Sequence, residues 1–371
     1  MQIGWIQLAE FRNYHTLEFA PSSHLNLLTG PNAQGKTNLL EALGFLLTGR
    51  SFRTSRMVEI PRWEATSASI SGEIRRAEGG RTVRRMIRKL DNGAARASGD
   101  TCEWARVIAF GWQDLDIING APGARRSFID GFAGRLYPGH LAALMRYRQI
   151  LARRNHVLQS REGRAAAPVV DVDGQLEPWD EQLASVGMEL VGRRRKAAAM
   201  LQTELGRVFP ALSGVRQKVE IRYRTALGEA TEAAEMLAAL VRLRRVELRR
   251  GVSLVGPHRD DLAIELDGID VRAFGSRGQQ RLIALALRLA EVLPVTEAAG
   301  TTPVLLLDDA LSELDARVRQ NVLREIDGAE QVFLTSPEAL PARGAACWTV
   351  RAGAVDRKGG EDVAGEIVAQ A

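Results

Sequence analysis

The chain has 371 residues, 45% of them hydrophobic and 26% charged, a composition that excludes an intrinsically disordered protein and allows one or two full-sized cores. The formal net charge is only +5, and 35 glycines and 13 prolines spread along the chain exclude collagen-like and low-complexity classes. Two cysteines, no signal-peptide pattern and no apolar run of about 18 residues predict a cytoplasmic protein without a membrane partner.

The N-terminal part of the chain has the pattern of a strand, a loop and a helix. Residues 3–8 and 24–29 have the character of strands, and the second strand ends in a glycine-rich turn. An apolar helix is expected at 38–47, ending near Gly49. Residues 66–90 are expected to form polar, solvent-facing strands with a break at Gly79 and Gly80.

The middle of the chain has helical periodicity. Apolar residues recur at helical spacing over 124–161 and 178–205, which predicts two long amphipathic helices joined by a turn at 162–177. A third helix is expected at 229–250, after a strand at 219–223. The chain then returns to strand-rich sequence at 253–255, 262–266, 304–307 and 331–334.

Residues 30–37 fit the pattern G-x-x-x-x-G-K-[ST] between the expected strand and the expected helix. Glycines let backbone N–H groups turn toward phosphate oxygens, and the N-terminus of the helix adds its partial positive charge. Lys36 is expected to bridge the β- and γ-phosphates of ATP, and Thr37 to direct its hydroxyl to Mg²⁺. The predicted cradle comprises Gly30, Pro31, Asn32, Ala33, Gln34, Gly35, Lys36 and Thr37.

A second motif is the apolar strand at 304–307, which is followed by Asp308 and Asp309. Four apolar residues in a row indicate a strand buried on both faces of a parallel sheet, and ligands bind at the carboxyl ends of such strands. We expect Asp308 to hold Mg²⁺ and Asp309 to orient or deprotonate the attacking water. The 271 residues between Lys36 and Asp308 are far more than small GTPases or nucleoside kinases interpose, so a large segment is inserted.

Ser276, Gly278 and Gln279 precede an apolar helix expected at 281–293. Ser276 can cap this helix and Gly278 can expose its first backbone groups, which predicts either a second anion-binding helix terminus or an ordinary capped helix. ABC-type ATPases carry an S-x-G-Q motif of this form, and it touches the γ-phosphate bound by the P-loop of a second head. The similarity implies a homodimer closed by ATP.

Taken together, these residues resemble the RecF family of bacterial DNA replication and repair proteins from residue 1 to about 336. The P-loop is shared by many ATPases, whereas the stretch Gly-Pro-His-Arg-Asp-Asp-Leu at 256–262 and the order of the motifs are specific to this family. The other matching segments are 11–14, 49–53, 119–122, 125–130, 276–281, 306–309 and 312–315.

The resemblance implies an α/β fold, namely an ABC-type P-loop ATPase head at 1–122 and 251–371 with an inserted, mostly helical arm lobe at 123–250. Such heads are related to those of Rad50 and SMC proteins. Family members bind ATP and Mg²⁺, dimerise upon ATP and bind double-stranded and gapped DNA. They act as weak, DNA-stimulated ATPases and help to load RecA at single-strand gaps with RecR and RecO. By position, Arg12 and Asn13 approach the nucleotide and Asp315 lies in the D-loop.

Three positions depart from the related patterns. Gln113 lies in Gly-Trp-Gln-Asp-Leu, where the family usually reads Ser-Pro-Glu-Asp-Leu, and it takes the Q-loop role only loosely. Thr335 stands where transporter heads carry a histidine, and Asp309 replaces their glutamate. A shorter base predicts slow turnover suited to a switch. His258 is either a catalytic base or a structural histidine.

Two other classes of protein remain open from the sequence. A transporter-type nucleotide-binding subunit would need membrane partners, and it does not account for segment 256–262 or for the size of the insert. An SMC-like structural ATPase would need a long coiled coil, for which no sustained heptad is visible.

The arginines are clustered. Nine lie between Arg125 and Arg164, and seven basic residues lie between Arg75 and Lys89. Arginine-favouring codons of a GC-rich genome, solvated helix faces and interior ion pairs each account for part of this bias. The clusters also predict a surface for polyanions, with sequence-tolerant and salt-sensitive DNA contacts at 75–89 and 146–154.

Overall fold

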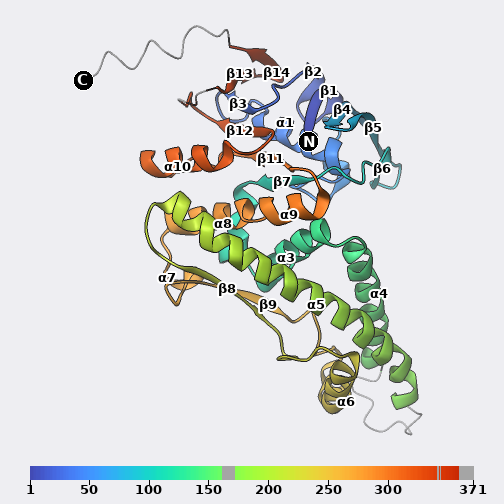
Figure 1. Ribbon diagram of the computed structural model, residues 1–371. Helices are drawn as coiled ribbons and strands as arrows, with labels where there is room; N and C mark the ends of the chain where they lie inside the picture. The colour runs from blue at the N-terminus through green and yellow to red at the C-terminus, as the bar shows by residue number, and fades with distance from the viewer. Residues whose placement is uncertain (161–171, 341, 343, 359–371) are drawn as a thin grey trace. The chain divides into compact units, whose positions relative to one another are not determined.

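The computed structural model describes residues 1–160, 172–340, 342 and 344–358, which form two compact units. The first unit contains residues 1–115, 207–216 and the described residues from 277 onward; the second contains the remaining described residues between 116 and 276. Figure 1 shows their elements. Residues 251–276 belong to the second unit, and the domain bounds derived from the sequence stay a prediction.

An antiparallel sheet in the order β2-β1-β4-β5-β6 forms part of the first unit. Its strands are β1 (Gln2–Phe11), β2 (Tyr14–Phe19), β4 (Ser67–Arg76), β5 (Gly79–Lys89) and β6 (Ala95–Gly99). In β5, buried Val83 and Ile87 alternate with exposed Arg84 and Arg88, because successive side chains of a strand point to opposite faces. The polar strands expected at 66–90 are confirmed, with the turn just before Gly79.

The second sheet of this unit has the order β14-β13-β3-β12-β11-β7, and all its neighbours are parallel except the edge strand β14. Its strands are β3 (Leu25–Thr29), β7 (Val107–Phe110), β11 (Val304–Leu307), β12 (Val332–Ser336), β13 (Ala346–Arg351) and β14 (Ala354–Arg357). All four residues of β11 are buried, which confirms the fully covered strand expected there. The carboxyl ends of β3, β11 and β12 therefore lie at one edge of the sheet.

Helix α1 (Lys36–Thr48) is buried between the two sheets, where it contacts β1, β4 and β5 as well as β7, β11 and β12 (Figure 1). Every residue from Leu39 to Leu47 is buried, as in helices that are apolar on all sides. Gly49 ends the helix in the left-handed conformation with φ of 69°. The position of α1 fixes the loop that precedes it.

The further helices of the first unit are α8 (Arg277–Leu289), α9 (Val292–Ala299), α10 (Ala316–Ile326) and the 3₁₀ helices η1 (Met57–Glu59) and η2 (Trp112–Leu115). Among them, α8 contacts β7 of the parallel sheet and η1 contacts β5 and β6 of the antiparallel sheet. The helix expected at 281–293 starts four residues earlier and ends at Leu289, and α9 follows it.

The second unit is mostly helical and contains a three-stranded antiparallel sheet in the order β10-β9-β8. Its elements are α2 (Asp116–Asn119), α3 (Pro122–Leu136), α4 (His140–Gln159), α5 (Val172–Ser213, which continues into the first unit), β8 (Val219–Arg224), α6 (Ala233–Arg250), β9 (Asp261–Leu266), β10 (Ile269–Asp270) and α7 (Val271–Phe274). Among the described residues, no helix has both the length and the apolar character that a membrane span requires.

Two expectations for this unit were wrong. The helix expected at 124–161 is interrupted after Leu136, because Pro138 and Gly139, with φ of 80°, form a turn between α3 and α4. The strand expected at 253–255 is a loop. Its backbone N–H groups bond side chains instead of a neighbouring strand, since Ser253 N donates to Asn155 Oδ1 at 2.9 Å.

The turn expected at 162–177 falls mostly on residues 161–171, which lie outside the described residues. Helix α5 already begins at Val172, so the turn was expected to end too late. The glycines, proline and aspartates of this stretch favour a loop by composition, but helix propensity is a weak signal that tertiary packing overrides.

A buried ion cluster holds the helices of the second unit together. Arg154 of α4 is fully buried and donates to Asp180 at 2.6 Å, to Glu247 at 2.7 Å and to Ser253 at 2.7 Å. Both carboxylates are also fully buried. Because these partners come from α5, α6 and the loop after α6, one guanidinium connects four segments. Removing one partner of such a buried ion pair strongly destabilises the fold, because it leaves the other charge buried without compensation.

Replacing Arg154 by alanine is therefore expected to lower the free energy of unfolding by about 3–5 kcal/mol, because two carboxylates would stay buried without their main cation. Urea denaturation followed by circular dichroism measures the change. The matched control is Arg148→Ala on the same helix, where the exposed side chain predicts a change within about 0.5 kcal/mol. Equal effects of the two substitutions would contradict the assignment.

Candidate nucleotide-binding site

The loop at 30–37 connects the end of β3 to the start of α1, and its backbone has left-handed conformations. The φ angles are 145° at Gly30, 63° at Ala33 and 116° at Gly35. A Cβ added to Gly30 would lie 2.3 Å from the carbonyl oxygen of Val350, so no other residue fits there. A Cβ on Gly35 would lie 2.6 Å from Asn13 Nδ2. These constraints give the loop the shape that cradles phosphate in the motif it matches.

Lys36 closes over this loop. Its ammonium donates to the carbonyl oxygens of Gly30 and, at 2.8 Å, of Pro31. Burial lowers the pKa of Lys36, and the nearby carboxylates of Asp309 and Asp308 act in the opposite direction. The ammonium is thus held at the loop and lies near both aspartates that follow β11.

Thr37 and Asp308 form the second contact of the site. The hydroxyl of Thr37 lies 2.9 Å from Asp308 Oδ1 and 2.8 Å from Oδ2, to which it donates. Burial raises the pKa of Asp308, while hydrogen bonds from Thr335 and Thr37 stabilise its charged form. A hydroxyl and a carboxylate at this distance are the protein oxygens that Mg²⁺ takes together with phosphate oxygens and waters, so the residues present fit this ion.

Thr335, at the end of β12, positions both aspartates. Its hydroxyl donates to Asp308 Oδ1 at 2.8 Å and accepts from the backbone N–H of Asp309 at 2.8 Å. Asp309 has φ of 51°, and its carbonyl oxygen accepts from Arg281 of α8. Its own side chain stays half exposed. We propose that Thr335 is a positioning residue, whereas the carboxylate of Asp309 is open to a water molecule.

Gln113 lies on η2, directly after β7, which is the neighbour of β11 in the sheet. A Cβ added to Gly111 would lie 2.8 Å from Gln113 Oε1 and 4.0 Å from Asp308 Cβ. The geometry therefore brings this glutamine to the carboxyl edge that carries Asp308. Next to it, Trp112 is 65% exposed.

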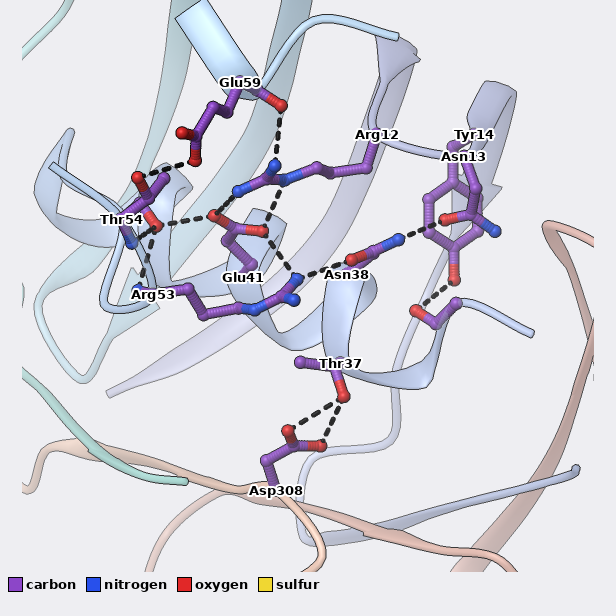
Figure 2. A network of polar contacts seen from close by, with 12 residues as sticks. Arg12, Asn13, Tyr14, Thr37, Asn38, Glu41, Arg53, Thr54, Glu59 and Asp308 are labelled. Atoms are coloured by element: carbon purple, nitrogen blue, oxygen red, sulfur yellow. Dashed lines mark hydrogen bonds and ion pairs between the residues drawn. The ribbon is translucent and has the colours of Figure 1, made fainter. Parts of the chain in front are cut away.

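A polar network links the loop and α1 to neighbouring segments (Figure 2). Glu41 is fully buried in the apolar helix α1 and accepts two hydrogen bonds from Arg12, at 2.8 Å and 2.7 Å. Arg53 lies 3.2 Å from the same carboxylate and donates to Asn38 at 2.6 Å. Asn13 accepts from Asn38 at 2.7 Å and donates to the backbone oxygen of Gln34 at 3.1 Å.

This network gives two of the predicted residues partners within the chain. The side chains of Arg12 and Asn13 bind Glu41, Asn38 and the loop backbone, and their expected approach to the nucleotide stays a prediction. Sequence reasoning missed Glu41 altogether. The available signal was a single carboxylate inside the apolar run of α1, because a charge buried there needs cationic partners.

The signature residues lie at the start of α8, which begins at Arg277. A Cβ on Gly278 would meet nothing within 4 Å, so packing inside the chain does not require glycine at this position. Asp315 caps α10, and its carboxylate accepts from the backbone N–H of Val318 at 2.8 Å. The expected nucleotide contacts of Ser276, Gln279 and Asp315 stay predictions.

Comparison with known proteins identifies the family. Residues 6–119 match the family described as AAA domain. The DNA replication and repair protein RecF of Heliobacterium modesticaldum is 35% identical over 96% of this chain and 99% of its own length. The chain belongs to the RecF family.

Solved structures agree with this assignment. The structure of the recombination mediator protein RecF-ATP in the RecFOR pathway has a TM-score of 0.83 and 29% identity over 96% of this chain and 97% of its own. The Smc head domain from Pyrococcus furiosus, 16% identical over 96% of this chain and 95% of its own with a TM-score of 0.52, has the same fold. The ABC-type ATPase head with a helical insert is thus confirmed.

The stretch at 256–262, on which the resemblance to RecF partly rested, is bonded within the second unit. Arg194 donates to the carbonyl oxygen of Pro257 at 2.6 Å, and Arg125 forms a bidentate pair with Asp261 at 2.7 Å and 2.9 Å. The same stretch contacts α3, α4 and α5, since Tyr147 of α4 bonds His258. Through these hydrogen bonds, the stretch at 256–262 links α3, α4 and α5.

His258 has partners on both ring nitrogens. Nε2 lies 3.1 Å from the carbonyl oxygen of Ser253, which can only accept, so Nδ1 accepts from the hydroxyl of Tyr147 at 2.7 Å. Burial, with further contributions from nearby arginines, lowers the pKa of His258 to about 4. A neutral ring that is committed at both nitrogens supports the structural role over the catalytic one.

Replacing Thr335 by valine is expected to lower the free energy of unfolding by about 1–3 kcal/mol near neutral pH, because the Asp308 carboxylate loses a hydrogen bond. The loss raises the pKa of Asp308 further. The difference in free energy of unfolding between the wild type and Thr335→Val should therefore shrink as the pH falls through that pKa, since Asp308 is then protonated in both proteins. Urea unfolding over a pH series that runs from about pH 7 down through the titration of Asp308 measures it, with Thr335→Ser as the matched control that keeps the hydroxyl. A pH-independent effect, or an equal loss in the serine variant, would refute the bond's role.

Proposed function

We propose that this chain is an ATP-dependent DNA-binding protein of recombinational repair and replication-fork maintenance. ATP and Mg²⁺ bind at the loop of residues 30–37, two heads pair on DNA, and slow hydrolysis ends the paired state. The single observation that carries this proposal is the contact of Thr37 with Asp308 beside the glycine-constrained loop.

Each side chain of the site has a role in this proposal. Lys36 neutralises the terminal phosphates, and the loop's backbone N–H groups bind phosphate oxygens. Thr37 and Asp308 hold Mg²⁺, which when bound neutralises charge developing on the phosphates. Asp309 orients the attacking water from its exposed carboxylate, and Gln113 lies at the same edge. Thr335 keeps both aspartates in place.

The signature residues support the proposed pairing of two heads. A glycine with open space around its Cβ position leaves the first turn of α8 accessible to a ligand from outside the chain. Helix N-termini bind anions. We assign Ser276 and Gly278 to the γ-phosphate of ATP bound by a second copy, so that ATP joins the two heads.

Partners follow from the family. The related RecF protein is described as a recombination mediator in the RecFOR pathway. The proposed partners of this chain are double-stranded and gapped DNA, RecR and the RecO pathway, with help to RecA loading at single-strand gaps. The protein acts in the cytoplasm as a weak, DNA-stimulated ATPase. Full-length similarity to RecF favours this function over a transporter-type subunit.

Replacing Lys36 by alanine is expected to abolish ATP-dependent dimerisation, because the phosphates lose their main positive charge in the loop. Size-exclusion chromatography with light scattering measures the dimer with and without ATP and Mg²⁺. The exposed Lys196 supplies the control variant Lys196→Ala, which should dimerise as the wild type does. An ATP-induced dimer in the Lys36 variant would contradict the proposed role.

The substitution Asp309→Asn is expected to keep ATP binding and dimerisation but to slow hydrolysis by about 100-fold, since a general base typically contributes that much. Phosphate release measures turnover, and light scattering measures how long the dimer lasts. Asp327→Asn, at an exposed position after α10, is the control. Unchanged turnover in Asp309→Asn would move the base to another residue.

A further inference from the structure

The strand β5 separates its arginines onto two faces. Arg85 is buried and donates to the carbonyl oxygens of Leu46 at 3.0 Å and Leu47 at 3.4 Å, near the end of α1. Arg84 and Arg88 lie on the opposite, exposed face. These outward arginines can meet a partner whereas the buried Arg85 cannot, so the cluster at 75–89 does not act as a whole.

The outward face contains an unfavourable arrangement of charge. Arg88 of β5 lies directly opposite Arg96 of β6, and both side chains are exposed. Like charges at directly opposed positions of an antiparallel pair destabilise the sheet. Within the described residues, no carboxylate lies within ion-pair distance of Arg84, Arg88 or Arg96. A polyanion from outside the chain would neutralise these arginines, and relief of their repulsion would favour its binding.

The neighbouring strand supplies hydroxyl groups to the same face. Ser67, Ser69 and Ser71 of β4 are the register partners of Arg88, Met86 and Arg84. Arginine and serine side chains are common donors to phosphate oxygens in protein–DNA contacts. On the far side of Arg84, the Asp100 carboxylate accepts from the Arg84 backbone N–H at 3.0 Å, so it marks the edge of the basic surface.

These positions favour duplex DNA over other polyanions. A protein partner requires a buried apolar centre, but between the arginines this face offers one exposed apolar side chain, Met86. Single strands are bound on aromatic side chains, and the cross-strand rows through Arg84, Met86 and Arg88 contain none. Cross-strand rows of arginine and serine suit a phosphate backbone.

We propose that the outward face of β4, β5 and β6 binds the phosphate backbone of duplex DNA, with Arg84, Arg88 and Arg96 as the contacting cations. This inference rests on the proposed function, because it names the surface through which the head meets DNA. It places the contact on the antiparallel sheet of the first unit and excludes the buried Arg85.

The test is the triple variant Arg84→Gln, Arg88→Gln, Arg96→Gln, compared with the wild type by fluorescence anisotropy of a labelled mixed-sequence duplex. The assay contains ATP and Mg²⁺ and covers a series of salt concentrations. The expected result is an affinity at least about 10-fold lower, and a plot of log K against log salt whose slope is shallower by about 2–3, since each lost phosphate contact removes about 0.9. The triple Arg→Lys variant should restore most of both quantities.

Two controls separate binding from folding. Arg222→Gln with Arg224→Gln removes exposed arginines of β8 that are already paired with carboxylates, and duplex binding should not change. The single variant Arg96→Gln should keep or raise the melting temperature, because it relieves the repulsion with Arg88. A lower melting temperature in Arg96→Gln would mean that the pair is structural, which would overturn the inference.

The remaining outcomes are distinguishable. A triple variant that binds duplex DNA with wild-type affinity and slope would overturn the surface while leaving the proposed function intact. A wild-type protein that binds no duplex with ATP and Mg²⁺ would overturn both. Wild-type binding of labelled poly-glutamate as tight as that of the duplex, lost equally in the triple variant, would assign the face to an acidic protein and overturn the DNA assignment.

Discussion

The burial of helix α1 between two sheets is the constraint on which the site depends. Because strands of both sheets cover this helix, its N-terminus and the preceding loop have one available position. This burial includes the carboxylate of Glu41 inside an apolar helix, and ion pairs with two arginines offset the unfavourable free energy of burying its charge. Arg12 arrives from the end of β1 and Arg53 from the loop after α1, so the same ion cluster that permits the burial also ties the loop to its surroundings.

The polar side chains of the site lie where the parallel strands end. Asp308 follows β11, Thr335 lies one residue before the end of β12, and Thr37 lies at the start of α1, after the loop that follows β3. Neighbouring parallel strands bring these side chains within hydrogen-bond distance although the sequence separates them widely. Thr335 thereby has contacts that suit a positioning role, at the position where transporter heads carry a histidine. It organises two carboxylates by donating to one and accepting from the backbone of the other, which leaves the Asp309 side chain open to solvent.

Much of the fold and of the site was predictable from local patterns. The buried strand at 304–307, the alternating strands at 66–90 and the glycine-rich loop before α1 were recognisable because their signals lie within a few neighbouring residues. The interruption after Leu136 was missed although Pro138 and Gly139 signal a turn locally. The loop at 253–255 was not predicted because its side-chain bonding depends on distant partners such as Asn155. Arginine clustering was visible, but not which arginines were buried.

The sequence by itself determined the motif chemistry: a loop that needs glycine at positions 30 and 35, a lysine and a threonine at its end, and a pair of aspartates after an apolar strand. Those features are local, so composition and spacing reveal them. Only the tertiary structure decided which charged side chains are paired inside the protein. Arg85, Arg154 and Arg12 are committed to carbonyl oxygens and carboxylates contributed by other segments, whereas Arg84, Arg88 and Arg96 face outward, because pairing and burial depend on elements that the chain brings together from far apart.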